Sequence, residues 1–337
     1  MYLEGIVAEG EKEYECNART NGKCDGCGNC GKTPTAAQER YFFLFDTMCG
    51  HSAQRCRFDE DMTDMAKMIN ISGFYEGDTD NNIDFLFGFA GYEYRKVTAE
   101  FKTAIVASID AGKPVLAKVK DGDGRTRVIT GYDGDTLICP DFSNAQRKPE
   151  TAPAYSDLVA IYVIGNKITP RYTVIDGLKR IQQVMEYNVN EKLWDGYMEK
   201  MGLYTADSLG KCSVEEKKAR MKRVAETMWH TFNCHNFAEV FRKYLDNGDA
   251  SPYDIVGDMG KLRNPALKPL WAEISGPCNG YTHDLAWALI GLEECANWEK
   301  HAGGFFGEMV ELTLGQIKKN DEKALEAIKS AIAILGA

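Results

Sequence analysis

Several features that would assign this chain to a class of protein are missing from its sequence. Its 337 residues contain no apolar run near the roughly 20 residues that a membrane span requires, and the first residues lack the basic and apolar regions of a signal peptide. Positive charge is also in deficit, with 40 Lys and Arg against 50 Asp and Glu. Because phosphate backbones and anionic lipids repel an acidic surface, we expect a cytoplasmic protein that binds neither nucleic acid nor membrane.

The sequence also lacks polar low-complexity tracts and any repeat of fixed period, so we expect an ordered chain. Its length favours two domains over one. Eleven cysteines are present, but their number is odd and no export signal precedes them, which favours reduced thiols over a disulfide scaffold. Four of these cysteines lie within the first thirty residues and need a separate explanation.

The first half of the chain predicts helices followed by a sheet. Residues 98–111 carry apolar side chains at four-residue intervals, and Gly112 follows as the expected C-cap. Four short β-rich runs come next, separated by Asp-Gly turns typical of antiparallel hairpins. These runs are PVLAKV, RVITGYD, TLICPD and LVAIYVIG.

Beyond Arg171 the strand pattern gives way to helical periodicity. Pro170 marks the expected boundary, because proline ends regular elements. We therefore predict an α+β protein with a Cys-rich head at 1–33, an α+β domain at 34–170 and an all-α domain at 171–337. The long helical stretches are expected at 174–201, 214–245, 284–302 and 305–335.

The order of motifs in the first half resembles a known family of cysteine peptidases. Cys30-Gly31 precedes an apolar helix, Gly112-Lys113-Pro114-Val115 opens the β-rich region, and Thr130-Gly131-Tyr132-Asp133 precedes Pro140-Asp141. This order is similar to that of the papain-like, bacteriocin-processing (double-glycine leader) peptidases and the butirosin-biosynthesis acyltransferase type. The resemblance covers about residues 30–165. It implies a papain-like domain in which Cys30 is the nucleophile and Asp141 orients the general base.

The expected general base is missing from this pattern. The family has a histidine just before the Thr-Gly-Tyr-Asp turn, whereas residues 125–129 read Arg-Thr-Arg-Val-Ile. A guanidinium stays protonated at any working pH, so it cannot accept the thiol proton. Arg127 has two open interpretations: a solvated strand residue paired with a surface carboxylate, or a contact for an anionic group of a ligand.

The Cys-rich head predicts a metal site that competes for the same thiol. Four thiolates in one short loop are typical of zinc sites, with an iron–sulfur cluster as the alternative. Disulfides, free thiols and buried unliganded cysteines also stay open. Because coordination consumes the thiolate, Cys30 cannot be ligand and nucleophile in one state. The candidate ligands are Cys16, Cys24, Cys27 and Cys30.

Other thiol and imidazole groups offer weaker candidates. Cys49 and His51 are considered as a displaced catalytic pair or as ligand contacts, although residues two apart on a helix point away from each other. In the helical half, His230 and Cys234 have the i, i+4 spacing of a chelating pair, but they also fit a packed core. The aromatic residues between 287 and 306 are expected in the core or at a homodimer face.

The missing base favours a non-catalytic, degenerate peptidase-like protein that binds a small amide or peptide ligand and carries a metal-binding head. One alternative is an active thiol-dependent amidase, peptidase or acyltransferase that uses Cys30 or Cys49. Another makes the Cys-rich head a metal or redox switch that regulates docking to a partner.

Overall fold

The protein is seen in a computed structural model that describes residues 45, 47–50, 53, 79–120, 127–139, 153–190, 211, 213, 215, 216, 258–275 and 310–336. The chain divides into two compact units. Unit 1 comprises Met1–Tyr41 and Asp84–Arg171, and unit 2 comprises Phe42–Ile83 and Tyr172–Ala337. These units differ from the domains expected from the sequence by assigning 42–83 to the second unit, and the three-part division stays a prediction.

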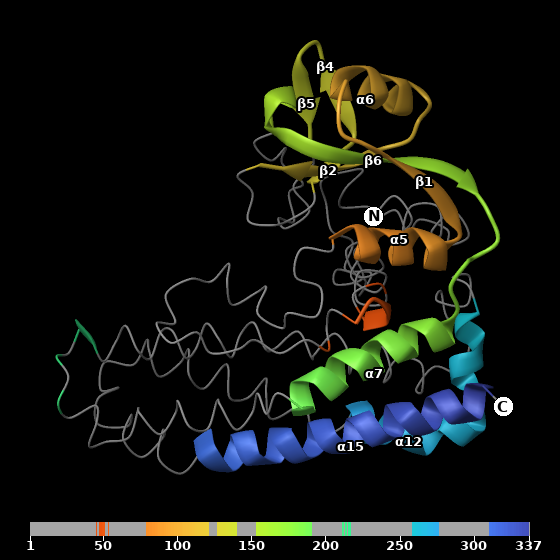
Figure 1. The fold of residues 1–337 in the computed structure, drawn as a ribbon, viewed down its shortest axis with the longest axis vertical. Helices are drawn as coiled ribbons and strands as arrows, with labels where there is room; N and C mark the ends of the chain where they lie inside the picture. The colour runs from red at the N-terminus through yellow and green to blue at the C-terminus, as the bar shows by residue number, and fades with distance from the viewer. Residues whose placement is uncertain are drawn as a thin grey trace, which may run out of the picture. The chain divides into compact units, whose positions relative to one another are not determined.

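Unit 1 contains an antiparallel sheet of four described strands. Its order is β1-β6-β2-β3, and every neighbouring pair is antiparallel (Figure 1). A second sheet pairs β4 with β5 around the turn at Gly134. Helices together with antiparallel sheets confirm the α+β class. The strands are β1 Tyr92–Val97, β2 Val115–Val119, β3 Arg127–Ile129, β4 Gly131–Asp133, β5 Thr136–Ile138 and β6 Leu158–Lys167.

Helix α6, Phe101–Asp110, confirms the helix expected over 98–111. The helix ends in a Schellman motif at Gly112. In this motif the Gly112 N–H donates to the Ile109 carbonyl over 2.8 Å, and the Lys113 N–H donates to the Ser108 carbonyl over 2.9 Å. Gly112 has φ 74°, in the left-handed region that favours glycine. The turn therefore ends the helix and directs the chain into β2.

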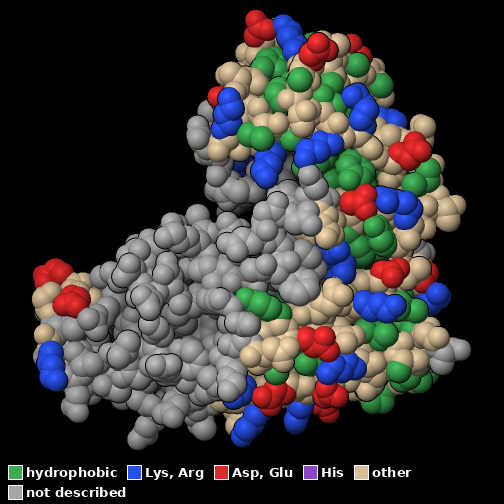
Figure 2. Space-filling view, viewed as in Figure 1, with side chains coloured by type: hydrophobic (Ala, Val, Ile, Leu, Met, Phe, Trp, Pro, Cys, Tyr) green, Lys and Arg blue, Asp and Glu red, His purple; other side chains and the backbone are tan. Residues whose placement is uncertain are grey.

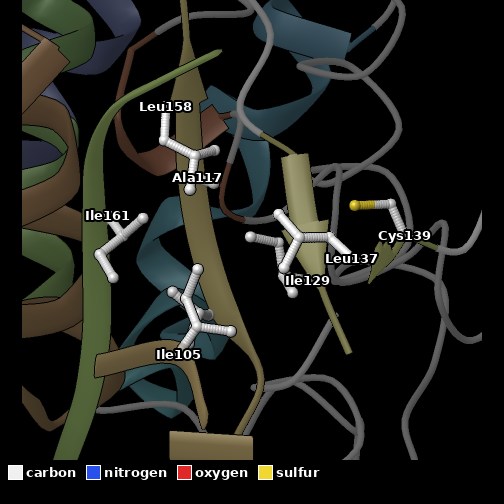
Figure 3. Close-up of a cluster of buried hydrophobic side chains, with 8 residues drawn as sticks. Ile105, Ala117, Ile129, Leu137, Cys139, Leu158 and Ile161 are labelled. Atoms are coloured by element: carbon white, nitrogen blue, oxygen red, sulfur yellow. The ribbon is translucent and has the colours of Figure 1, made fainter. Parts of the chain in front are cut away.

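One face of the sheet packs against α6 through an aliphatic cluster (Figure 3). Antiparallel pairing aligns Val97, Ile161, Ala117 and Arg127 in one row across the four strands. Because paired residues point to the same face, Ile161 and Ala117 meet Ile105 of α6 there. All three side chains are fully buried. This layer fixes the register, since a one-residue slip would turn the apolar set outward.

The other face of the sheet is aromatic and meets α5, Thr79–Ala90 (Figure 1). The rings of Phe87 on α5 and Tyr94 on β1 stack at 4.9 Å, and Tyr94 lies 6.2 Å from Tyr162 on β6. Gly91, with φ 76°, connects the helix to β1 and accepts a hydrogen bond from Ile168 N–H. Neither α5 nor β1 was predicted from the sequence pattern.

In unit 2, the described residues from Tyr172 onward that form regular elements are helical. Helix α7 begins with a capping box in which Asp176 accepts from Thr173 N–H over 2.8 Å. None of the described helices is long and apolar enough to cross a membrane. An all-α domain over 171–337 stays a prediction. The helical elements are α7 Val174–Asn190, η4 Met259–Arg263, η5 Pro265–Leu267, α12 Lys268–Ser275 and α15 Val310–Gly336.

Candidate functional site

The structure describes two of the site residues expected from the sequence, Arg127 and Cys49. The other predicted site residues lie outside the described residues and stay predictions. These are Cys16, Cys24, Cys27, Cys30, His51 and Asp141.

Arg127 begins β3, the last strand at one end of the described sheet, and is half-buried. Its register partner is Ala117, so its side chain belongs to the face that carries α6. Arg95 lies on the same face of the sheet, in the neighbouring row of paired residues. It belongs to β1, which is at the opposite end of the strand order from β3. The sheet thus carries an arginine on each of its two described outer strands.

The motif block on which the resemblance chiefly rests has structural roles in this fold. The Lys113 ammonium donates a hydrogen bond to the Gly165 carbonyl on β6 over 2.9 Å, and Val115 is fully buried in the aliphatic cluster. Thr130 N–H donates to the Ile138 carbonyl, and the Tyr132 hydroxyl donates to Asp110 on α6 over 2.8 Å. These contacts join α6, the hairpin and the sheet.

Exposed groups of α6 and the hairpin also shift one another's pKa values. Lys102 on α6 forms an ion pair with Asp135, which raises the pKa of Lys102 and lowers the pKa of Asp135 through a side-chain hydrogen bond and charge attraction. The hydrogen bond to Asp110 raises the pKa of Tyr132. Because these groups are solvent-exposed, the pairs stabilise only weakly.

Cys49 lies in unit 2 with 6% of its surface exposed and forms no disulfide. Its carbonyl accepts a hydrogen bond from Arg180 Nε on α7 over 3.2 Å. The two terminal nitrogens of Arg180 donate to the side-chain oxygens of Asn81 and Asn82 over 2.9 and 2.6 Å. One guanidinium therefore joins residues 47–50, the start of α5 and α7. Such a buried thiol is poorly accessible to substrate or reagent.

The neighbouring contacts of Cys49 are structural too. Gly177 on α7 packs on Met48, and a Cβ at that position would lie 2.8 Å from the Met48 sulfur. Asn188, near the end of α7, donates to the Ala53 carbonyl over 2.8 Å. We therefore define the α7 seam as the contact of Met48, Cys49 and Ala53 with Gly177, Arg180 and Asn188 of α7.

The candidate binding site is an open pocket in unit 1 that is lined by residues of α5, β1 and β6, and by Ile168 and Arg171 beyond β6. Its volume is about 750 Å³, within the range of small-molecule sites. Residues 93–96 of β1 all line it, as do 163–165 of β6. Since successive side chains of a strand point to opposite faces, four consecutive lining residues mean that main chain also borders the pocket.

Charges of both signs surround this pocket. The Arg171 guanidinium forms an ion pair with the Asp84 carboxylate at 2.7 Å, and the Arg171 main-chain N–H donates to the Gly88 carbonyl. Glu93 and Arg95 are exposed and have no side-chain partner among the described residues. Figure 2 shows basic and acidic side chains interspersed over the visible surface of the described residues. The charged residues that line the pocket are therefore the Arg171–Asp84 pair together with Glu93, Arg95 and Lys96.

Gly165 keeps the two strands close at the edge of this pocket. A Cβ at Gly165 would lie 2.7 Å from Glu93 Cβ and 3.1 Å from the Glu93 main chain. Glu93 and Gly165 thus face each other, and Glu93 shares the strand face of Arg95 two residues later. Neither Glu93 nor Gly165 was predicted as a site residue, although the alternation in YEYRKV is typical of a strand.

Comparison with known proteins gave no match to a family model, a curated protein or a solved structure. The resemblance to cysteine peptidases therefore stays an expectation from the motifs. Among the described residues there is no group of three or more His, Cys, Asp or Glu side chains placed to hold a metal ion. The four cysteines expected to bind metal lie outside that part of the chain.

Proposed function

We propose that the protein is a non-catalytic binding module, degenerate relative to cysteine peptidases, that takes a small amide or peptide ligand. The observation that carries the proposal is the pocket lined by residues of α5, β1 and β6. Its size suits a small ligand, and its border combines strand main chain, guanidinium, carboxylate and an aromatic ring. A peptide offers the complementary groups: amides, charged ends and an apolar side chain.

The sequence supports the non-catalytic half of this proposal. No histidine occurs in residues 125–129, where the resembling family has its base, and Arg127 cannot replace it. Removal of a base from a nucleophile–base pair lowers turnover by several orders of magnitude in enzymes of this chemistry. The 6% exposure of Cys49 also argues against this thiol as a nucleophile.

A titration with a neutral amide tests the binding proposal. We expect dialanine capped by an N-acetyl and a C-amide group to shift the amide NMR signals of residues 93–96 and 163–165. Signals of β3 and β5, which do not line the pocket, serve as the internal control. A titration with amide and peptide probes that leaves the pocket signals unchanged would refute the proposal.

The active-enzyme alternative makes a different prediction. If Cys30 or Cys49 were an activated nucleophile, iodoacetamide would label it rapidly near pH 6, where ordinary thiols are protonated. The proposed binding module has no such thiol. Mass spectrometry of the labelled peptides distinguishes the two functions, and rapid labelling of either residue would favour the enzyme.

The metal-binding head is the second part of the proposal. Its support is the spacing of Cys24, Cys27 and Cys30, with Cys16 eight residues before them. Metal analysis of the purified protein would show about one zinc per chain, or iron with sulfide for the alternative cluster. Replacement of Cys24 by serine would lower that content, whereas Cys139→Ser, at a buried thiol just after β5, would leave it unchanged. Metal-free protein would contradict this part alone.

A further inference from the structure

The chain that leaves β6 passes the C-terminal end of α5 as a short segment, residues 168–171, which we call the strap (Figure 1). The Ile168 N–H donates to the Gly91 carbonyl over 2.8 Å, and the Arg171 N–H donates to the Gly88 carbonyl over 2.8 Å. The last carbonyls of a helix have no partner within the helix, so they need donors from elsewhere. The main chain of the strap therefore caps α5.

The strap lies very close to the end of this helix. A Cβ at Gly91 would lie 2.7 Å from the Ile168 carbonyl oxygen and 3.2 Å from the Pro170 ring. Such a distance to a main-chain atom leaves no room for a side chain at this position. Glycine thus permits an approach of the strap that a larger residue would prevent.

One side chain of the strap also reaches α5. The Arg171 guanidinium forms the 2.7 Å ion pair with the Asp84 carboxylate and donates to the Asp84 carbonyl over 3.3 Å. Asp84 and Gly88 lie about one helical turn apart, so the strap contacts two successive turns of α5. The side chains of Arg171 and Asp84 are 44% and 33% exposed. Dissolved salt can therefore screen this ion pair.

The strap and α5 together form part of the pocket wall. Asp84 lines the pocket from the helix, and Ile168 and Arg171 line it from the strap. The two partners of the ion pair are 87 residues apart in the sequence. Their pairing thus fixes the distance between two parts of the wall that the local sequence does not connect.

We propose that Arg171 is a positioning residue of the pocket, which holds the strap in the place that ligand binding requires by pairing with Asp84. This inference rests on the proposed function and adds a form of regulation to it. The affinity for an uncharged ligand then depends on an ion pair within the protein. Because salt screens partly exposed charges, high salt weakens the binding of a neutral amide.

The test measures the binding of doubly capped dialanine by NMR titration. This probe carries no charge, so it forms no ion pair with Glu93, Arg95 or Lys96, which also line the pocket. We expect Asp84→Asn and Arg171→Gln each to weaken binding about fivefold, the upper range for a partly exposed ion pair. Asp84→Arg combined with Arg171→Asp restores the pair with exchanged charges. This double variant should bind within about twofold of the wild type.

The response to salt gives a second readout that a general loss of folding would not produce. About 1 M salt should weaken binding by the wild type and by the charge-exchanged variant to the level of the single variants. The single variants lack the ion pair, so their affinities should stay unchanged in salt. Wild-type affinity that does not respond to salt would overturn the inference.

Lys102→Gln is the matched control, because it breaks another exposed ion pair of unit 1, with Asp135, and neither residue lines the pocket. It should leave the affinity unchanged, and an effect equal to that of Arg171→Gln overturns the inference. If Arg171 contacts the ligand directly, Asp84→Asn frees the guanidinium and keeps or strengthens binding. That result, or failure of the exchanged charges to restore binding, overturns the inference and leaves the proposed function. Absence of wild-type binding to every amide and peptide probe overturns both.

Discussion

The aliphatic cluster of unit 1 and the α7 seam of unit 2 hold distant segments together in different ways. The cluster joins α6 to the sheet through side chains such as Ile105, Ala117 and Ile161, which make no hydrogen bonds. The seam joins Cys49 and Ala53 to α7 through Arg180 and Asn188, which donate to their main-chain carbonyls. Apolar burial scales with area and tolerates changes of angle, whereas a carbonyl acceptor fixes position and direction.

The five tryptophans allow the two units to be followed separately. All of them lie between residues 194 and 298, in the part of the sequence assigned to unit 2. Tryptophan fluorescence therefore reports the unfolding of unit 2. Hydrogen exchange of the amides of β2 and β6 reports the stability of unit 1.

The largest effect is expected in the aliphatic cluster. Ile161→Ala removes a fully buried side chain from the centre of the sheet and should lower the free energy of unfolding by about 3 kcal/mol. Protection of β2 and β6 amides measures this loss. Val159→Ala is the matched control, since Val159 is 42% exposed on the same strand. Comparable losses of amide protection in Ile161→Ala and Val159→Ala would disprove the role of the cluster. An equal loss of stability in the unfolding followed by tryptophan fluorescence would show that the two units unfold together.

A smaller effect is expected at the α7 seam. Arg180→Met keeps much of the apolar stem but removes the donors to Cys49, Asn81 and Asn82. Because a buried carbonyl then loses its charged donor, we expect about 2 kcal/mol less stability for unit 2 in urea unfolding followed by tryptophan fluorescence. Lys179→Met, at the exposed neighbouring position, should have little effect. An unchanged midpoint for Arg180→Met would mean that apolar contacts alone hold the seam.

The smallest effect is expected at the Lys102–Asp135 pair, outside both regions. Because the folded-state pKa of Asp135 is lowered, its contribution to stability is present above the unfolded pKa near 3.8 and is lost as the pH falls through the folded pKa. The folded-state pKa of Lys102 is raised, so the contribution of Lys102 to stability is present below the unfolded pKa of 10.5 and is lost as the pH rises through the folded pKa.

Lys102→Met should therefore weaken unit 1 slightly between these limits and flatten that pH dependence. Urea unfolding at several pH values measures the change, and about 1 M salt should abolish it by screening. Lys167→Met, which also removes one exposed positive charge from unit 1, provides the control for altered net charge. A difference between the variants that survives high salt would contradict an electrostatic origin.

Local sequence patterns predicted much of unit 1. Helix α6, its stop at Gly112 and strands β2 and β6 follow from apolar periodicity and turn residues, which act over a few positions. Helix α5 was not predicted, because Phe85, Phe87 and Phe89 are all buried and alternate at a period of two, which is unlike an amphipathic helix. The predicted Arg127 lies on β3, while the pocket lies at β1 and β6.

The sequence by itself determined the α+β class, the capped end of α6 and the absence of a histidine from residues 125–129, because each depends on neighbouring residues. The tertiary structure decided the strand order β1-β6-β2-β3, the burial of Cys49 and the pocket. These features join residues far apart in the chain, such as Asp84 with Arg171 and Glu93 with Gly165. Their contacts depend on strand register and helix placement, which local periodicity does not encode.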